Sequence, residues 1–170
     1  TAPATQDVVF NSDVQLRRDV TIAGNDITFN GKIDSESGRR SLTVNTSNSG
    51  LTIFDGTVGG TRALKSLTTN RDGTTRLGAN ITVDMLDATF NDPVRLTNDV
   101  RVRGLRDAFI TFNNTIDSQG NTHRNLTLLT DTTLPSTTSP LPVISFAADV
   151  GSQFALGNLY LNYDPSLSVD

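Results

Sequence analysis

Apolar and polar residues alternate in short triplets along the chain. Examples that run apolar, polar, apolar are Val20-Thr21-Ile22, Leu42-Thr43-Val44 and Ile81-Thr82-Val83. This period of two is typical of β-strands with one buried face, because successive side chains of a strand point to opposite sides. No segment shows a helical period of useful length. Thr, Val, Asn, Asp and Gly are abundant, which favours many short strands joined by tight turns.

A five-residue motif recurs between these triplets: Phe, a polar residue, two further residues, then Val or Ile. Six of the eight phenylalanines occupy it, namely Phe10, Phe29, Phe54, Phe90, Phe112 and Phe146. In five of the six copies the residue after Phe is Asn or Asp, at Asn11, Asn30, Asp55, Asn91 and Asn113. A degenerate copy begins at Leu77. The copies recur about every 19 to 25 residues where none is degenerate or interrupted, which is the length of one three-stranded rung of a parallel β-helix.

A longer repeat is superimposed on this motif. Residues 7–24 align without a gap with residues 87–104, and the segment ITFNGKIDS at 27–35 matches ITFNNTIDS at 110–118. The match continues to the segment ALGNLYLNYD at 155–164, after an insertion at 132–142 that the first copy lacks. The chain therefore contains two duplicated blocks, at about 7–86 and 87–164.

These repeats predict an all-β fold, a single right-handed parallel β-helix over residues 1–170 with about seven to eight rungs and no significant helix. The phenylalanines are expected to stack as one internal ladder, with the Val or Ile of each motif in the next column. The Asn or Asp after each Phe is expected to form a corner in the left-handed conformation and to hydrogen-bond along the axis.

Two β-sandwich domains of about 80 residues each are the alternative fold. The long duplication fits that arrangement equally well. The short motif favours the solenoid, because strands of a sandwich differ in length and core residue whereas rungs of a solenoid are equivalent.

Segments such as ITFNGKIDS, LTIFDGTVGGTRALKSLTTN and GTTRLGANITV resemble the β-strand repeats of giant bacterial surface proteins, in the style of filamentous-haemagglutinin-type adhesins and autotransporter passenger regions. The resemblance covers nearly the whole chain and is specific for the repeat type. It implies a secreted β-helical stalk or fibre at the cell surface or released from it. The insertion at 132–142 and the divergent end, with Tyr160 and Tyr163, depart from a uniform stalk.

Composition narrows the classes of partner. The chain has no cysteine, so no disulfide scaffold supports it, which fits bacterial export. Its formal net charge is −4 and no basic stripe is present, so nucleic acid is not expected as a partner. No apolar run approaches the length of a spanning helix, so no membrane insertion is expected.

Candidate chemistry is sparse. His123 is the only histidine, and a solvated turn explains it better than a catalytic base. Asp19 and Asp99, and Asp34 and Asp117, are repeat-equivalent carboxylates at turns, better explained as turn formers than as a catalytic pair. No cofactor and no catalytic or metal-binding residue is predicted. Asp and Asn oxygens at corners are candidate ligands for weak calcium sites.

Three functions are compatible with this pattern. The first is a structural module that forms a rod or filament, with neighbouring repeats of the same polypeptide or other copies as its partners. The second is an adhesin that binds a glycan or host protein through the solenoid face or a contact loop; the candidate contact residues are Thr132, Pro135, Pro140, Pro142, Tyr160 and Tyr163. The third, least favoured, is a polysaccharide-active enzyme, which would need acidic and basic side chains aligned in one outer groove.

Overall fold

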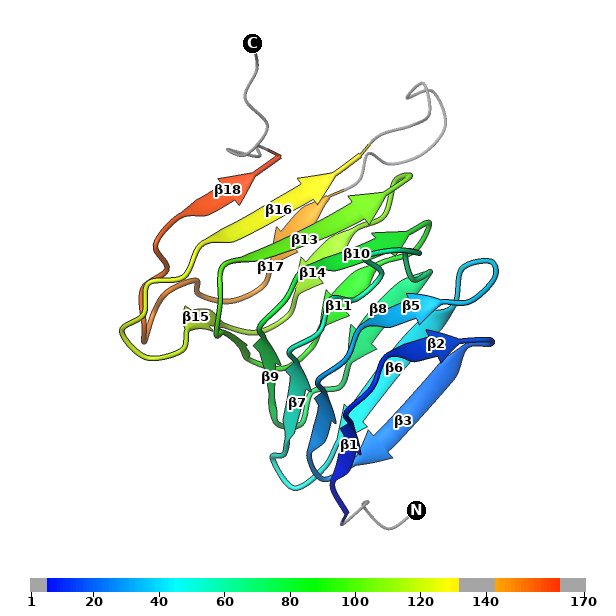
Figure 1. Ribbon diagram of the computed structural model, residues 1–170. Coiled ribbons are helices and arrows are strands. Elements are labelled where there is room, and N and C mark those ends of the chain that lie inside the picture. Colours follow the sequence, from blue (N-terminus) through cyan, green and yellow to red (C-terminus); the bar gives the residue numbers. More distant parts are fainter. Residues whose placement is uncertain (1–5, 132–142, 163–170) are drawn as a thin grey trace.

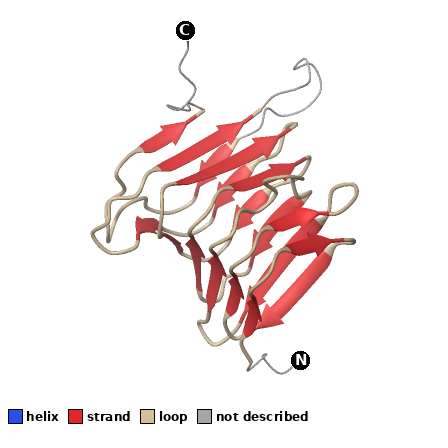
Figure 2. Cartoon of the chain, in the orientation of Figure 1, coloured by secondary structure: helices blue, strands red, loops and turns tan. Residues whose placement is uncertain are grey.

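The structure is a computed structural model, and it describes residues 6–131 and 143–162. Over these residues the chain forms short β-strands and no helix. Every strand pairing is parallel, and the strands form three sheets around one apolar core (Figures 1 and 2). The chain is therefore a parallel β-solenoid, which confirms the predicted fold class.

We name the three sheets A, B and C in the order in which each turn of the chain passes through them. Sheet A contains β1 (Val8–Phe10), β4 (Ile27–Phe29), β7 (Leu51–Phe54), β9 (Thr74–Leu77), β12 (Val94–Leu96) and β15 (Ile116–Ser118). Sheet B contains β2 (Val14–Leu16), β5 (Ile33–Ser35), β10 (Ile81–Asp84), β13 (Val100–Leu105), β16 (Leu126–Thr130) and β18 (Leu159–Leu161). Sheet C contains β3 (Val20–Gly24), β6 (Ser41–Thr46), β8 (Ser66–Thr69), β11 (Ala88–Phe90), β14 (Ile110–Phe112) and β17 (Ile144–Phe146).

Sheet B is interrupted in the third turn. There the single residue Val58 bridges Ile33 of β5 to Ile81 of β10, and no strand of full length forms. The described residues make about six turns, fewer than the seven to eight predicted. One reason is that the last step in sheet A, from Ile116 to Val150, spans the insertion at 132–142 and uses more chain than any earlier turn.

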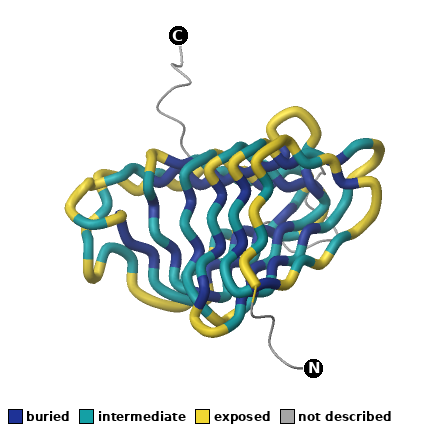
Figure 3. The backbone as a smooth tube through the Cα atoms, turned by 60° about the horizontal axis from the view of Figure 1, so that its bottom comes forward, coloured by how far each residue is buried: buried dark blue, intermediate teal, exposed yellow. Residues whose placement is uncertain are grey.

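The apolar-polar alternation of the sequence sets the direction of the side chains. In β6 the odd positions are half-buried and the even positions, Leu42, Val44 and Thr46, are buried. The same alternation runs along the strands of the central turns, and exposure is concentrated at the turns between strands (Figure 3). The buried Phe, Leu, Ile and Val side chains form one continuous core.

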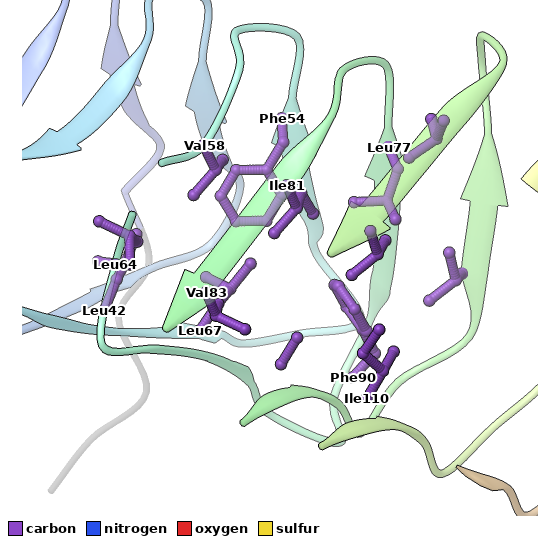
Figure 4. Close-up of a cluster of buried hydrophobic side chains, with 14 of the residues drawn as sticks. Leu42, Phe54, Val58, Leu64, Leu67, Leu77, Ile81, Val83, Phe90 and Ile110 are labelled. Atoms are coloured by element: carbon purple, nitrogen blue, oxygen red, sulfur yellow. The ribbon is translucent and has the colours of Figure 1, made fainter. Parts of the chain in front are cut away.

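The phenylalanines form two stacks instead of the single ladder that the motif predicted. Phe10, Phe29 and Phe54 stack in sheet A, with ring centroids 4.9 and 5.3 Å apart and nearly parallel rings. Phe90, Phe112 and Phe146 stack in sheet C, with centroids 4.9 and 5.7 Å apart. Figure 4 shows Phe54 and Phe90 on different sides of the core, and the degenerate motif residue Leu77 follows Phe54 in sheet A.

The two stacks arise because the duplicated blocks are rotated relative to each other. The strand β1 of the first block lies in sheet A, whereas its counterpart β11 in the second block lies in sheet C. In the same way β2 in sheet B corresponds to β12 in sheet A, and β3 in sheet C corresponds to β13 in sheet B. The second block begins three full turns and two strands after the first. Repeat-equivalent residues therefore lie on different sheets and face different directions.

We expect the stacks to carry a large share of the stability. Replacing Phe112 with Ala removes a fully buried ring held between two others, and should lower the free energy of unfolding by about 3–5 kcal/mol. Phe10→Ala is the control: Phe10 is only partly buried and touches one ring, so the loss should be smaller. Urea unfolding followed by circular dichroism measures both, and equal losses would contradict this account.

Candidate functional site

Carboxylates placed immediately before strands connect successive rungs. In each case one carboxylate oxygen accepts a hydrogen bond from the backbone N–H of the equivalent residue one rung further on, at 2.7 to 3.2 Å. We call these residues the strand-start carboxylates. They are Asp7, Asp13, Asp19, Asp26, Asp87 and Asp99, and Asn80 does the same with its amide oxygen. Their recipients are Asp26, Lys32, Ser41, Leu51, Phe109, Asn125 and Arg101 respectively.

Sequence analysis treated Asp19 and Asp99 as turn formers and missed this shared role. The signal was present, because Asp7, Asp13, Asp19 and Asp26 recur every six or seven residues, which is one strand and one turn. At Asp7 the side-chain hydrogen bond from Asn25 and the backbone N–H of Asp26 lower the pKa of the carboxyl below its ordinary value. The oxygens that accept these N–H groups are used by the fold.

Four of the five corner residues hydrogen-bond in pairs along the axis, as expected, but none has the expected backbone conformation. The Asn30 amide donates to the Asn11 side chain at 2.8 Å, and Asn113 donates to Asn91 at the same distance. Asp55 does not hydrogen-bond in this way; its carboxylate lies against Gly78 one rung later. None of the five corner residues has a positive φ, so the left-handed conformation predicted for them is wrong.

Asp34 and Asp117 play a second structural role, which the duplication preserves. One oxygen of Asp34 accepts the backbone N–H groups of Thr61 and Arg62, both at 2.9 Å. One oxygen of Asp117 accepts those of Gln153 and Phe154, at 2.9 and 3.0 Å. Each carboxylate thereby holds a loop that leaves the sheet in the next turn.

The two loops have the same construction. They run from Val58 to Leu64 and from Val150 to Leu156, and each begins with a glycine of positive φ, Gly59 at 67° and Gly151 at 72°. A side chain on Gly59 would meet the backbone of Thr82 at 2.2 Å. This position therefore requires glycine for its conformation and for the close approach of the next rung.

A polar crevice lies beside each loop. The first crevice has a volume of about 320 Å³ on sheet B. It is lined by Asp13, Gln15, Lys32, Asp34, Ser35, Glu36, Thr61 and Arg62. The second crevice has a volume of about 260 Å³ on sheet A. It is lined by Leu51, Thr74, Arg76, Arg95, Gln119, Gly120 and Phe154. Because of the rotation between the blocks, repeat-equivalent crevices lie on different faces of the solenoid.

The first crevice brings acidic and basic side chains together on one outer face, the arrangement that a polysaccharide-active enzyme requires. Its carboxylates, however, have structural partners. Asp13 accepts the Lys32 N–H, Asp34 holds the loop, and Glu36 pairs with Arg17 at 3.0 Å. In an exposed position such an ion pair contributes little to stability.

A third cavity, of about 350 Å³, adjoins the first crevice and shares Thr61 and Arg62 with it. At its base Asp84 is nearly buried and accepts hydrogen bonds from Arg39 and from Arg106, the latter at 2.6 and 3.0 Å. Burial alone raises the pKa of Asp84, but the hydrogen bonds and charges of Arg106 and Arg39 outweigh it, so the pKa lies below its ordinary value. The cluster ties the second, fourth and fifth turns together.

Asp92 lies inside the solenoid. Its side chain is fully buried at the corner between sheets C and A and accepts hydrogen bonds from the hydroxyls of Thr69 at 2.6 Å and Thr75 at 2.8 Å. Burial raises the pKa of this carboxyl above its ordinary value, against the opposing effect of the two hydroxyls. Asp92 aligns with Ser12 of the first block, and the following residue is Pro93, where the first block has the strand-start carboxylate Asp13.

The remaining predicted site residues are dispersed. His123 is exposed in a turn with a φ of 50°. Tyr160 lies in β18 beside Thr127 of β16. Thr132, Pro135, Pro140, Pro142 and Tyr163 fall outside the described residues.

The described residues contain neither a metal-binding cluster nor a membrane-spanning helix. No group of three or more His, Asp or Glu side chains within residues 6–131 and 143–162 is arranged to hold a metal ion. No helix in this part of the chain is long and apolar enough to span a membrane.

Comparisons with known proteins returned no relative. No family model matches the chain, no curated protein matches its sequence, and no solved structure matches its fold.

The strand-start carboxylates generate a prediction about stability. Asp26→Ala removes the acceptor of the Leu51 N–H, a half-buried hydrogen bond of 2.7 Å, and should cost about 1–2 kcal/mol of unfolding free energy. Asp26→Asn keeps an oxygen in place, as Asn80 does naturally, and should cost much less. Urea unfolding of the two variants measures the difference. Equal losses would show that charge, and not the acceptor, matters.

Asp92 generates a prediction about pH. Its pKa in the folded chain is raised, so the folded state binds the proton more tightly than the unfolded state does, and stability falls as the pH rises through the folded pKa. Asp92→Asn removes this loss while keeping an acceptor for the threonines. The variant should therefore be more stable than the native chain at pH 7, and the advantage should shrink as the pH falls toward 3.8. Thermal unfolding across this range measures it, and a pH-independent difference would contradict the assignment.

Proposed function

We propose that the chain is a structural module of a bacterial surface or fibre protein, secreted to the cell exterior, and that further rungs extend it into a rod. The observation that carries the proposal is the state of the apolar columns at the two ends. At the first turn Val8, Phe10, Val14, Val20 and Ile22 are only partly buried. Their partners one rung further in are fully buried; these are Ile27, Phe29, Ile33, Leu42 and Val44.

Among the described residues, the apolar columns at the other end show the same pattern. Ile144, Phe146 and Val150 are partly buried, whereas Ile110, Phe112 and Ile116 beneath them are fully buried. In β18 Leu159 and Leu161 are 39% and 47% exposed. One more rung at either end would remove this apolar surface from water, which favours association. We propose that the rung comes from a neighbouring repeat of the same polypeptide or from another copy stacked end to end.

The free edges point to the same role. The N–H of Val14 donates to the carbonyl of Lys32, and the N–H of Glu36 donates to the carbonyl of Leu16. The backbone groups of Val14 and Leu16 therefore face β5, whereas those of Gln15 face away from it, where no strand of the described residues lies; we call this side the open edge. An unpaired strand edge of this kind is a template for a further strand.

Adhesion is a second candidate function, and the crevices favour it. They are hollows on an otherwise regular surface, lined by Arg, Gln, Thr and carboxylate side chains that suit a glycan or a polar protein segment. A catalytic role receives less support, because the carboxylates of the first crevice already serve the fold.

Assembly tests the rod proposal. One copy of about six turns is about 29 Å long at roughly 4.8 Å per rung. Negative-stain electron microscopy and sedimentation velocity at rising concentration should therefore show rods several times longer. Gln15→Pro removes an N–H at the open edge without removing a hydrogen bond to β5, and should shorten the rods.

The matched control is Gln15→Ala, which changes the same side chain and keeps the N–H, and should assemble as the native chain does. A folded native chain that stays a short monomer at every concentration would refute end-to-end stacking. Equal assembly of the Pro and Ala variants would show that this edge is not the contact.

A further inference from the structure

The second crevice differs from the first in charge, although the loops beside the two crevices are built in the same way. Three of the positions that line the two crevices correspond in the duplicated blocks. Gln15 of the first corresponds to Arg95 of the second, Glu36 to Gln119, and Arg62 to Phe154. The first crevice is lined by two cations and three carboxylates, whereas the second is lined by two arginines and no carboxylate.

The two arginines lie side by side on the outer face of sheet A. Arg76 of β9 and Arg95 of β12 are partners in register on neighbouring strands. Their backbones are therefore about 4.8 Å apart, and their side chains leave the sheet on the same face. Like charges directly opposite each other on neighbouring strands are destabilising. An anion between them would relieve this repulsion.

Arg95 is held in position by the fold. It hydrogen-bonds to the Gln153 side chain, and its guanidinium lies 5.2 Å from the centre of the Phe154 ring. Its nearest carboxylate oxygen is that of Asp117, 3.5 Å away, and this contact is an ion pair without a hydrogen bond. Arg76 forms no ion pair with any carboxylate in residues 6–131 and 143–162. One arginine is thus fixed in place and the other is available.

We propose that the second crevice binds the carboxylate of an acidic sugar residue. Guanidinium groups present planar, paired donors that match a carboxylate. The Gln119 amide and the Thr74 hydroxyl line the same space and suit sugar hydroxyls, and the Phe154 ring forms an apolar wall. The volume of about 260 Å³ fits a single sugar residue.

The charge of the whole chain selects among anionic ligands. With a net charge of −4, the chain repels a dense polyanion more strongly than a single carboxylate, which still gains the contact with the two arginines. The site therefore suits a glycan with a single acidic residue. This inference deepens the second candidate function, adhesion, and is independent of rod formation.

A titration of the whole ¹⁵N-labelled chain tests the site. The probes are a disaccharide ending in glucuronic acid, its neutral analogue ending in glucose, an analogue ending in glucose 6-sulfate, and sodium acetate. The glucuronic acid probe should cause saturable chemical-shift changes at the backbone amides of Gln119, Gly120 and Phe154. Added salt should weaken its binding, because salt screens the attraction between the arginines and the carboxylate. The neutral sugar, which lacks the carboxylate, and acetate, which lacks the sugar ring, should each bind at least about tenfold more weakly.

Three variants locate the binding. Arg76→Gln leaves the contacts of Arg95 intact and should weaken binding by about tenfold, the loss of one charge-assisted hydrogen-bonding partner. Gln119→Glu restores the acid of the first block and should abolish binding. Lys32→Gln removes one charge from the first crevice and should leave binding unchanged. Thermal unfolding verifies that each variant is folded.

The outcomes are distinct. The sulfated probe should bind more weakly than the carboxylated one, and equally tight binding of the two would overturn the assignment of the site to a carboxylate. Equal binding of the neutral sugar, equal binding of acetate, or full binding by Arg76→Gln would overturn the proposal. Arg76 lies in the fourth turn, away from both open ends, so loss of sugar binding and loss of assembly are separate results.

Discussion

Every rung of this solenoid depends on its neighbours for its backbone hydrogen bonds. A three-residue strand such as β4 cannot satisfy its N–H and C=O groups alone, so the rungs above and below must be in register. Register then forces like residues into columns. The strand-start carboxylates act on the same constraint at the turns, where no strand is present: Asp13 bonds to the N–H of Lys32, the residue that occupies its own position one rung later. Strands and turns are thus coupled along the axis by the same geometry.

The rotation between the two blocks breaks these columns at one level. In sheet C the column runs Ile22, Val44 and Thr69 before the second block begins with Phe90. In sheet A two threonines are buried on the neighbouring strands β7 and β9; they are Thr52 and Thr75. The junction therefore has a polar interior, and Asp92 is the carboxyl that the hydroxyls of Thr69 and Thr75 satisfy. The strand pairing continues across the junction, whereas the columns of like side chains are interrupted there.

Sequence periodicity correctly predicted the rungs, which are features of short segments. It did not predict on which sheet each residue lies, because that depends on the number of strands that precede it. The Phe motif and the apolar triplets predicted the parallel solenoid, because rung length is a property of short segments. The single Phe ladder was wrong, because an alignment of Phe10 with Phe90 does not say on which sheet each lies. That depends on Val58 serving as a whole strand in the third turn. Asp92 was equally hidden: it sits one residue before the position of a strand-start carboxylate, and only the direction of the corner turns it inward. The crevices combine residues from several turns, so no sequence window contains them.

The rotation also explains how one loop construction can serve two surfaces. Asp34 and Asp117 each fix a loop through two backbone N–H groups, so these contacts do not depend on the side chains of the loop. The charge that faces the crevice changes between the blocks, from Glu36 to Gln119 and from Arg62 to Phe154. Because each block begins two sheets further round than the one before it, the crevices of three successive blocks would lie on three different faces, and that of a fourth block would return to the first face. Polar sites on such a rod would be distributed around the axis, while the core and the strand-start carboxylates continue unchanged beneath them.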